Sequence, residues 1–248
     1  MTIQNQQDLD GILRTGRVVA SVLHSMLEHI EPGMTTAELD DFGRRLLEQH
    51  GARSAPQAMY DFPGATCISI NEQAAHGIPG ARRIEPNDVV NVDVSAVLDG
   101  YYADTGGTTV VPPGSALKRR LCHATQIALS AALQQVRDGA PINQIGRAAQ
   151  KVARRHGFRI IRNLAGHGVG RSLHEEPESI LGYHDPNDTR ILREGQVLAI
   201  EPFLSTHSTW VDEADDGWTL VGRPGNLSAQ FEHTVIVTKG APIVATRH

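Results

Sequence analysis

Side chains that bind divalent metals occur in five short segments of this chain. Four are carboxylates and one is an imidazole: Asp93 within 91–94, Asp104 within 103–105, His167 within 166–168, Glu201 within 199–202 and Glu232 within 230–233. Carboxylate oxygens and neutral imidazole nitrogens suit Mn, Co, Fe or Zn better than an ion that prefers thiolates. Two such ions bridged by carboxylates lie about 3.5 to 4 Å apart and lower the pKa of a shared water toward neutrality. The set therefore predicts the chemistry of a dinuclear metal hydrolase.

Two of these carboxylates lie in predicted buried strands. Residues 89–94 read VVNVDV and residues 197–201 read VLAIE, which are apolar, β-branched runs bounded by turn residues. Most Asp and Glu residues are solvated surface charges, but a carboxylate in a buried strand needs a partner, and metal coordination supplies one. A buried ion pair with Arg or Lys is the alternative, and it explains one such position more easily than two equivalent ones.

An internal repeat relates the two strands. Five matches share a spacing of 106 positions: Leu23 with Leu129, Leu27 with Leu133, Gly33 with Gly139, Leu39 with Ile145, and His50-Gly51 with His156-Gly157. The strand carboxylates Asp93 and Glu201 follow at a spacing of 108. Chance similarity of helix patterns is the alternative explanation, but several matches keep one register without a gap.

The elements that must position these residues occur in the same order twice. The apolar spacing predicts amphipathic helices over 12–30 and 117–136, each followed by a turn, a second helix and strands. Thr35 with Glu38 forms a plausible capping box for the second helix of the first half, and Gly51 a plausible stop. We expect one catalytic domain, 1–248, with similar α+β halves at about 10–115 and 116–240. Each half contributes carboxylates, with Asp104 and Glu232 as the second matched pair.

The motifs of this chain resemble those of the type I methionine aminopeptidase family. The similarity runs from the first helix to about Val237, and it rests on CISIN at 67–71, HGIP at 76–79, NVDV at 91–94, GHGVGR at 166–171, HEEP at 174–177 and SAQFEHT at 228–234. The resemblance implies the pita-bread fold, in which two pseudo-symmetric halves pack their helices outside a central curved antiparallel sheet.

The resemblance also implies how the ligands divide between two divalent ions, which are Co, Mn, Fe or Zn. Asp93 would bind one ion, and His167 and Glu201 would bind the other. Asp104 and Glu232 would bridge both. The identity of the physiological metal stays open at this point.

The implied activity is removal of an N-terminal methionine when the second residue is small. A hydroxide activated by both metals attacks the first peptide bond, and capture of the free amine makes the enzyme an exopeptidase. His174 would stabilise the oxyanion, Glu201 would move a proton to the leaving nitrogen, and His76 would hold the substrate near the scissile amide. Lone histidines are more often structural, and this chain has 12. His76 and His174 are distinguished by their glycine- and proline-flanked loops and by the family motifs.

An apolar slot for the methionine side chain is expected beside the metals, since a flexible thioether fits such a surface. Its predicted wall consists of Phe62, Cys67, Leu173 and Trp218. Leu173 stands where many relatives carry phenylalanine, and YDFP at 60–63 replaces a more aromatic segment, so the slot differs in shape. Cys67 and Cys122 lie in unrelated contexts and are expected to be reduced thiols.

Composition is that of a compact enzyme. The 248 residues, 40% of them hydrophobic, suffice for a full core without a linker. A net charge of −5 argues against a general nucleic-acid binder but leaves room for local basic patches that touch ribosomal RNA. Without a signal peptide or an apolar run of membrane-spanning length, the chain is predicted to be cytoplasmic and to have no membrane partner. We expect a monomer that acts on nascent polypeptide N-termini at the ribosome and binds no specific nucleic acid.

Three alternatives remain at the level of sequence. Proline-specific aminopeptidases and dipeptidases resemble this ligand set, but they usually carry a large N-terminal domain for which this chain has no room. Type II methionine aminopeptidases carry an inserted helical segment between the last two glutamates, and the interval from Glu201 to Glu232 is too short for it. A binding module that has lost catalysis is disfavoured because all five ligands and both histidines are present.

Overall fold

The structure is a computed structural model that describes residues 1–248. Its five helices are α1 (Gln6–His29), α2 (Thr36–Gln49), α3 (Ala55–Tyr60), α4 (Ala116–Leu133) and α5 (Asn143–His156). The strands up to α4 are β1 (Arg53–Ser54), β2 (Cys67–Ile70), β3 (Gln73–Ala75), β4 (Val89–Leu98) and β5 (Tyr101–Val110). Beyond α5 lie β6 (Arg159–Ile160), β7 (Ala165–Gly168), β8 (Glu175–Leu181), β9 (Val197–Ile200), β10 (Phe203–Ser205), β11 (Asp212–Glu213), β12 (Leu220–Val221), β13 (Ser228–Gln230), β14 (His233–Ile236) and β15 (Ile243–Val244).

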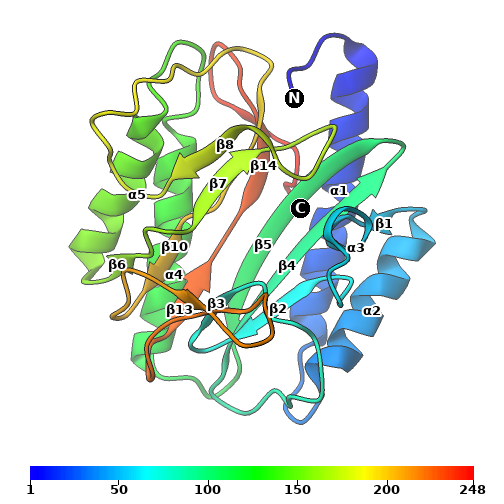
Figure 1. Ribbon diagram of the computed structural model, residues 1–248, viewed down its shortest axis with the longest axis vertical. Coiled ribbons are helices and arrows are strands. Elements are labelled where there is room, and N and C mark those ends of the chain that lie inside the picture. Colours follow the sequence, from blue (N-terminus) through cyan, green and yellow to red (C-terminus); the bar gives the residue numbers. More distant parts are fainter.

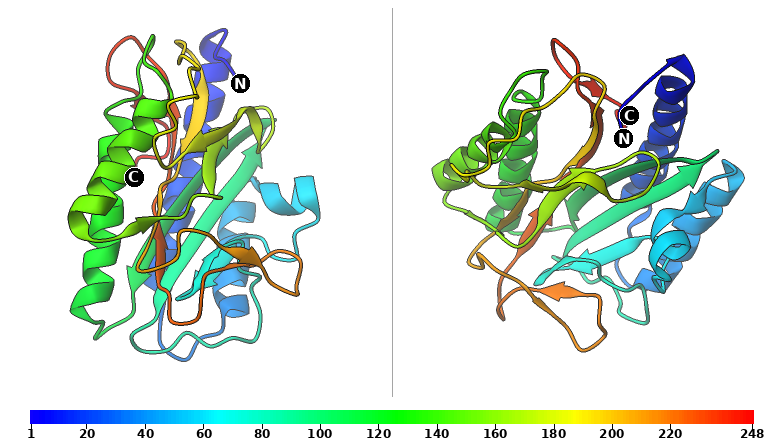
Figure 2. Two further views of the ribbon diagram at one scale, coloured as in Figure 1. Left: turned by 60° about the vertical axis from the view of Figure 1, so that its left-hand side comes forward. Right: turned by 45° about the horizontal axis from the view of Figure 1, so that its top comes forward.

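Two pairs of helices enclose the strands. In Figure 1, α4 and α5 lie on the left, α1 and α2 lie on the right, and the strands run between the pairs. The right-hand view in Figure 2 also has the two pairs on opposite sides of the strands. The expected α+β fold with helices outside antiparallel sheets is thus confirmed.

Every strand pairing in the molecule is antiparallel. The first large sheet is built on the long hairpin of β4 and β5, with β1 and β2 also paired to β4. The second has the order β15-β14-β9-β7-β8. Two small sheets, β13-β10-β6 and β11-β12-β3, complete the strands.

The two large sheets meet where β5 lies beside β14. The backbone N–H of Asp104 donates to Thr234 Oγ1 at 2.9 Å, and this hydroxyl donates to the Asp104 carbonyl at 2.8 Å. The hydroxyl of Thr105 donates to the Glu232 carbonyl, and the Glu232 N–H donates to the carbonyl of Gly106. These bonds connect segments about 130 residues apart and fix the place where ligands from both sheets can meet.

Each half of the chain has its own hydrophobic core. One cluster of 17 buried residues lies entirely within 18–111, between the first helix pair and β4. A second cluster of 23 buried residues comes from 121–237 apart from Val89. The predicted boundaries of the halves and the assignment of one catalytic domain stay predictions.

The helix ends follow local signals. The side chain of Asn5 accepts a hydrogen bond from the N–H of Asp8, and α1 therefore begins six residues before the predicted start at residue 12. The capping box of Thr35 and Glu38 is present at α2. That helix ends at Gln49, and Gly51 follows with a φ of +70°. None of the five helices combines the length and apolar character that crossing a membrane requires.

Candidate metal centre and catalytic cavity

All five predicted metal ligands lie together at the junction of the two large sheets. They lie in or next to five strands: Asp93 in β4, Asp104 in β5, His167 in β7, Glu201 directly after β9 and Glu232 directly before β14. Residues directly or diagonally opposed on neighbouring antiparallel strands share one face of a sheet. The pairing of β4 with β5 and of β9 with β14 brings the carboxylates to one place, and β7 adds the imidazole.

The ligand atoms form two overlapping groups, and within each group they lie within 4.8 Å of one another. Asp104, His167 and Glu232 form one group, and Asp93, Glu201 and Glu232 form the other. His167 Nε2 also lies 3.6 Å from Glu201 Oε1 and 3.7 Å from Asp104 Oδ2. Glu232 belongs to both groups, which is the arrangement that a bridging carboxylate needs.

Two oxygens of this cluster lack any hydrogen-bond partner. They are Asp104 Oδ1 and Glu232 Oε1, and the two residues are only 6% and 1% exposed. Buried polar atoms are nearly always paired, so each orphaned oxygen calls for a partner of another kind. Four carboxylates and one imidazole are donors that divalent cations prefer. The residues therefore fit a divalent metal centre.

Burial makes the carboxylates difficult to ionise together. Loss of surrounding water raises the pKa of Asp104 to about 6. Loss of water, with the nearby charge of Asp104 as a second cause, raises the pKa values of Asp93, Glu201 and Glu232 well above their usual range. A bound cation removes this penalty because it neutralises the repelling charges.

His167 presents a free lone pair to the cluster. Burial lowers its pKa to about 3, so the imidazole is neutral at ordinary pH. Its Nδ1 lies 3.0 Å from the carbonyl of Gly168. A carbonyl can only accept, so Nδ1 carries the proton and Nε2 keeps the lone pair that a metal requires.

A buried glutamine holds two of the carboxylates in place. The Nε2 of Gln230 donates to Glu232 Oε2 at 3.0 Å and to Glu201 Oε2 at 3.3 Å, while its Oε1 accepts from Asn91 Nδ2 at 2.9 Å. Groups that hydrogen-bond metal ligands fix the orientation of those ligands. Sequence reasoning missed Gln230, although its place two residues before Glu232 in an extended segment was an available signal.

A cavity of about 360 Å³ opens beside the ligand cluster. Ten of the eleven predicted site residues line it: Phe62, Cys67, His76, Asp93, Asp104, His167, Leu173, His174, Glu201 and Trp218. Glu232 lies among the ligands but outside the lining. The rings of Phe62 and Trp218 meet edge to face with centroids 5.2 Å apart. Sequence reasoning missed five lining residues, Pro56, Tyr60, Ala75, Ser95 and Phe203, which carry no local signal of their proximity.

Both predicted catalytic histidines face this cavity in neutral form. Burial lowers the pKa of His174 and that of His76. The ring of His174 lies 4.1 Å from the ring of His167, between centroids, and its Nδ1 is 2.6 Å from the Tyr60 hydroxyl. His76 has a φ of +54°, a left-handed conformation that non-glycine residues adopt only when their surroundings hold it.

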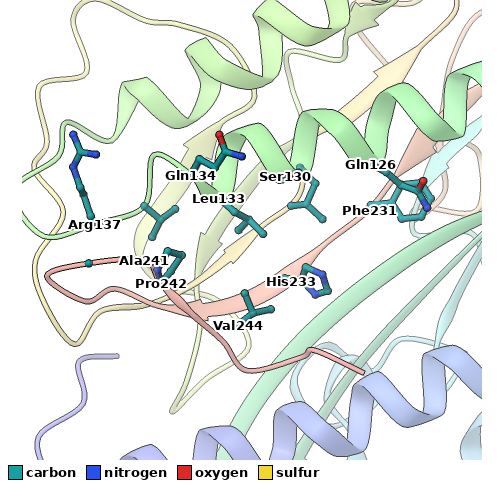
Figure 3. Close-up of a pocket in the computed structure, with 13 residues that line it drawn as sticks. Gln126, Ser130, Leu133, Gln134, Arg137, Phe231, His233, Ala241, Pro242 and Val244 are labelled. Atoms are coloured by element: carbon teal, nitrogen blue, oxygen red, sulfur yellow. The ribbon is translucent and has the colours of Figure 1, made fainter.

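A larger, more open cavity of about 780 Å³ lies between α4 and the β14–β15 segment. Figure 3 shows Leu133, Phe231 and Val244 lining it, with Arg137 and His233 as its titratable side chains. No carboxylate or cysteine contributes to this lining. It therefore offers neither a set of metal ligands nor a thiol nucleophile, unlike the ligand-lined cavity.

The family model for metallopeptidase family M24 matches residues 10–239. "Methionine aminopeptidase 2" of Bacillus subtilis (strain 168) is 45% identical over 248 residues, covering 100% of both chains. The chain belongs to metallopeptidase family M24, among its methionine aminopeptidases. "Methionine aminopeptidase" of Escherichia coli (strain K12) is 36% identical over 251 residues, covering 100% of this chain and 94% of that protein.

Solved structures agree with this placement. A methionine aminopeptidase from Rickettsia prowazekii superimposes with a TM-score of 0.95 at 35% identity, covering 100% of both chains. A prolidase from Pyrococcus horikoshii OT3 gives a TM-score of 0.79 at 22% identity, covering 99% of this chain and 63% of that one. The prolidase shares the fold alone. The expectations of a pita-bread fold and of a metal-dependent peptidase are confirmed.

Proposed function

We propose that this M24 enzyme removes the N-terminal methionine from nascent proteins and peptides whose second residue is small. The observation that carries the proposal is the ligand cluster at one end of a mainly apolar cavity. Names of relatives that are 36% to 45% identical support the same activity. Cytoplasmic action on N-termini as they emerge from the ribosome, by a monomer, belongs to this proposal.

The metal site of this proposal holds two divalent ions, of Co, Mn, Fe or Zn, through Asp93, Asp104, His167, Glu201 and Glu232. Glu232 and Asp104 would contact both ions. When bound, such ions polarise the scissile carbonyl and lower the pKa of a water to the neutral range.

His174 would stabilise the charge that develops on the carbonyl oxygen. A neutral imidazole donates from Nε2 only when Nδ1 is the unprotonated nitrogen, and a donor placed at Nδ1 favours that tautomer. The Tyr60 hydroxyl is 2.6 Å from that nitrogen, and burial raises the Tyr60 pKa, which keeps the phenol protonated and able to donate. Tyr60 is therefore a positioning residue that selects the useful tautomer of His174.

Glu201 would move the proton. Its carboxylate lines the ligand-bearing cavity, so it can exchange a proton with a water or peptide bound there. It would accept a proton during attack and return it to the leaving nitrogen. Gln230 keeps one oxygen of Glu201 fixed by its hydrogen bond at 3.3 Å.

The methionine side chain would occupy the wall of Phe62, Cys67, Leu173 and Trp218. Leu173 and Phe62 are each only 3% exposed, so other residues pack around these two side chains and hold the wall of the slot in place. An unbranched thioether fills such a slot, whereas a charged side chain would lose its hydration without a partner. His76 and His174 would crowd the side of the leaving group, which favours a small second residue.

A tripeptide panel tests the proposal. Metal-stripped protein is reconstituted with Mn, Co, Fe or Zn, and kcat/KM is measured for Met-Ala-Ser, Met-Leu-Ser, Lys-Ala-Ser and an X-Pro peptide. We expect Met-Ala-Ser to exceed Met-Leu-Ser by about 10²-fold, because a misplacement of about 1 Å can cost that much in rate. Equal rates for these two peptides, or preference for X-Pro, would contradict the proposal.

A further inference from the structure

Positive charge is concentrated in one part of this acidic chain. Residues 116–162, which span α4, α5 and β6, contain ten Lys and Arg residues but a single acidic residue, Asp138. This segment carries a formal charge of +9, whereas the remaining residues carry −14. So large a separation creates a positive potential over one side of the molecule.

Six of these residues form what we call the arginine face: Arg120, Arg147, Lys151, Arg154, Arg155 and Arg159. All six side chains are exposed. Arg147, Lys151, Arg154 and Arg155 follow one another at spacings of four, three and one, which places them on one side of α5. The opposite side of the helix is buried through Ile145, Ala149 and Ala153.

The arginine face spans two helices, and no ion pair neutralises its charge. The guanidinium of Arg120 donates to the carbonyl of His156 at 3.4 Å, which joins the start of α4 to the end of α5. None of the 11 ion pairs of the molecule involves a residue of this face. By contrast, Arg44 on α2 pairs with both Asp41 and Glu48. In both views of Figure 2, α4 and α5 form an outer side of the molecule.

We propose that the arginine face binds the phosphate backbone of double-helical RNA without regard to its sequence. Five of the six residues are arginines, whose planar guanidinium groups bind phosphate oxygens bidentately. From Arg147 to Arg155 the face extends about 12 Å along α5, at about 1.5 Å per residue. It can therefore contact several phosphates at once, and such contacts position a protein without reading bases.

Other polyanions fit this face less well. Single-stranded nucleic acid binds through stacking on aromatic side chains, but the one aromatic residue of this segment, Phe158, is buried. A membrane surface takes up the apolar side of an amphipathic helix, and the apolar side of α5 is already packed inside the protein. None of the six residues lines the ligand-bearing cavity, so bound RNA leaves that cavity free.

The choice of RNA rests on the proposed function, because nascent N-termini emerge from a particle whose surface is largely RNA. Attachment through the arginine face would keep the enzyme where its substrates first appear. Binding of RNA can nevertheless be measured without peptidase activity, so the two proposals can fail separately.

The test measures fluorescence anisotropy of a labelled 20-base-pair RNA duplex at 50, 100 and 200 mM salt with the metal-loaded enzyme. The variant is Arg154→Glu/Arg155→Glu. The matched control is Arg17→Glu/Arg53→Glu, which makes the same change in net charge at exposed residues outside the face. Circular dichroism and hydrolysis of Met-Ala-Ser check that both variants stay folded and active.

For the wild type we expect log K to fall linearly with log salt, with a slope of about −0.9 per neutralised phosphate. The face variant should bind at least about tenfold more weakly at 50 mM salt and should reduce the magnitude of the slope by about 2. The control should stay within about twofold of the wild type. Absence of RNA binding by the wild type, or equal loss in both variants, would overturn the proposal. So would binding to phosphatidylserine vesicles but not to the duplex.

Discussion

Two buried carboxylate oxygens, Asp104 Oδ1 and Glu232 Oε1, have no hydrogen-bond partner. Groups placed in this way favour metal binding but disfavour folding of the metal-free protein. Without metal, each of these groups lowers the stability of the fold, because it has lost its water and faces like charges. With metal bound, the same groups stabilise the fold because their negative charges attract the cation. The free energy of unfolding should therefore respond in opposite directions when such a group is neutralised with and without metal.

Glu232→Gln keeps the shape of the side chain and removes its charge. We expect the Tm of the metal-free protein to rise by a few degrees, while the Tm with saturating Mn falls below that of the wild type. Metal stoichiometry should drop, and kcat/KM should fall by more than about 10²-fold, beyond the loss typical of a residue that only supports a ligand. Calorimetry and metal analysis measure these changes, with exposed Glu213→Gln as the control. An equal loss of Tm with and without metal would contradict the expected opposite responses.

The contact of Tyr60 with His174 gives a second prediction for single residues. His174→Ala should retain metal and lose about 10²-fold in kcat, the scale for one oxyanion donor. Tyr60→Phe should lose about tenfold in kcat with little change in KM, equivalent to about 1.4 kcal/mol. In the His174→Ala background, Tyr60→Phe should cause no further loss, because its effect passes through the imidazole.

Tyr102→Phe is the matched control, because the Tyr102 hydroxyl donates to Met59 Sδ and not to a histidine. It should leave kcat unchanged in both backgrounds. If Tyr60→Phe reduces kcat equally with and without His174, then Tyr60 acts on the substrate directly and its assignment as a positioning residue is wrong.

Among the elements, β5 and β13 approach each other so closely that one glycine decides the geometry of the site. A Cβ added at Gly106 would lie 2.1 Å from the Gln230 Oε1, a distance that no packing tolerates. Gly107, the next residue on the same strand, would place its Cβ 3.0 Å from the flexible end of Leu27. A methyl group added on the Gly106 face of β5 would therefore collide with Gln230, whereas one added on the Gly107 face needs only a shift of Leu27.

Gly106→Ala should displace the Gln230 amide from Glu201 and Glu232. We expect metal affinity to fall by about 10- to 100-fold, the range for losing a group that orients metal ligands, and stability to fall by about 1 to 3 kcal/mol. Gly107→Ala should change metal affinity less than about threefold, because Leu27 can shift. Competition with a fluorescent chelator measures both affinities. A Gly107→Ala loss as large as that of Gly106→Ala would show that general strand distortion is responsible.

Much of this arrangement follows from local patterns in the sequence. The long helices and the capping box at Thr35 are predictable because amphipathic spacing and caps depend on residues a few positions apart. The carboxylates of β4 and β9 stand out because charge is rare within apolar, β-branched runs. Short strands such as β6 and β11, two residues each, carry no such pattern, since pairing with distant strands creates them.

Contacts between residues far apart in the sequence also restrict how much of the site can be predicted. Tyr60 and His174 touch across 114 positions, and nothing near either residue indicates that contact. Apart from its place two residues before Glu232, Gln230 resembles a surface glutamine, and only the fold shows that it is completely buried with Asn91 as its donor. Ligands have distinctive types and contexts, whereas residues that orient ligands are recognised only through their partners.

For the whole molecule, the metals would add a connection between the two main cores, whose halves also share two smaller apolar clusters. Asp93 and Asp104 extend from the first half, while His167, Glu201 and Glu232 belong to the second. Removal of metal should therefore lower stability well beyond the site. A ligand at 100 times its Kd stabilises a fold by about 2.7 kcal/mol, and about 1 kcal/mol changes Tm by 2 to 4 °C at this size.

We expect EDTA to lower Tm by about 5 to 10 °C and Mn to restore it. Scanning calorimetry measures the shift, and the Glu232→Gln variant serves as the control because it should hardly respond to EDTA. A wild-type Tm that does not depend on metal would mean that the halves are held together by protein contacts alone.

The order of the ligands along the chain has a consequence for biosynthesis. The first two, Asp93 and Asp104, leave the ribosome long before Glu232, the residue shared by both ligand groups. A growing chain that has folded only its first half holds two of the five donors, too few to retain an ion tightly or to cut a peptide bond. The enzyme thus stays inert throughout most of its own translation, and hydrolytic capacity begins only after a nearly finished polypeptide has closed β14 against β5.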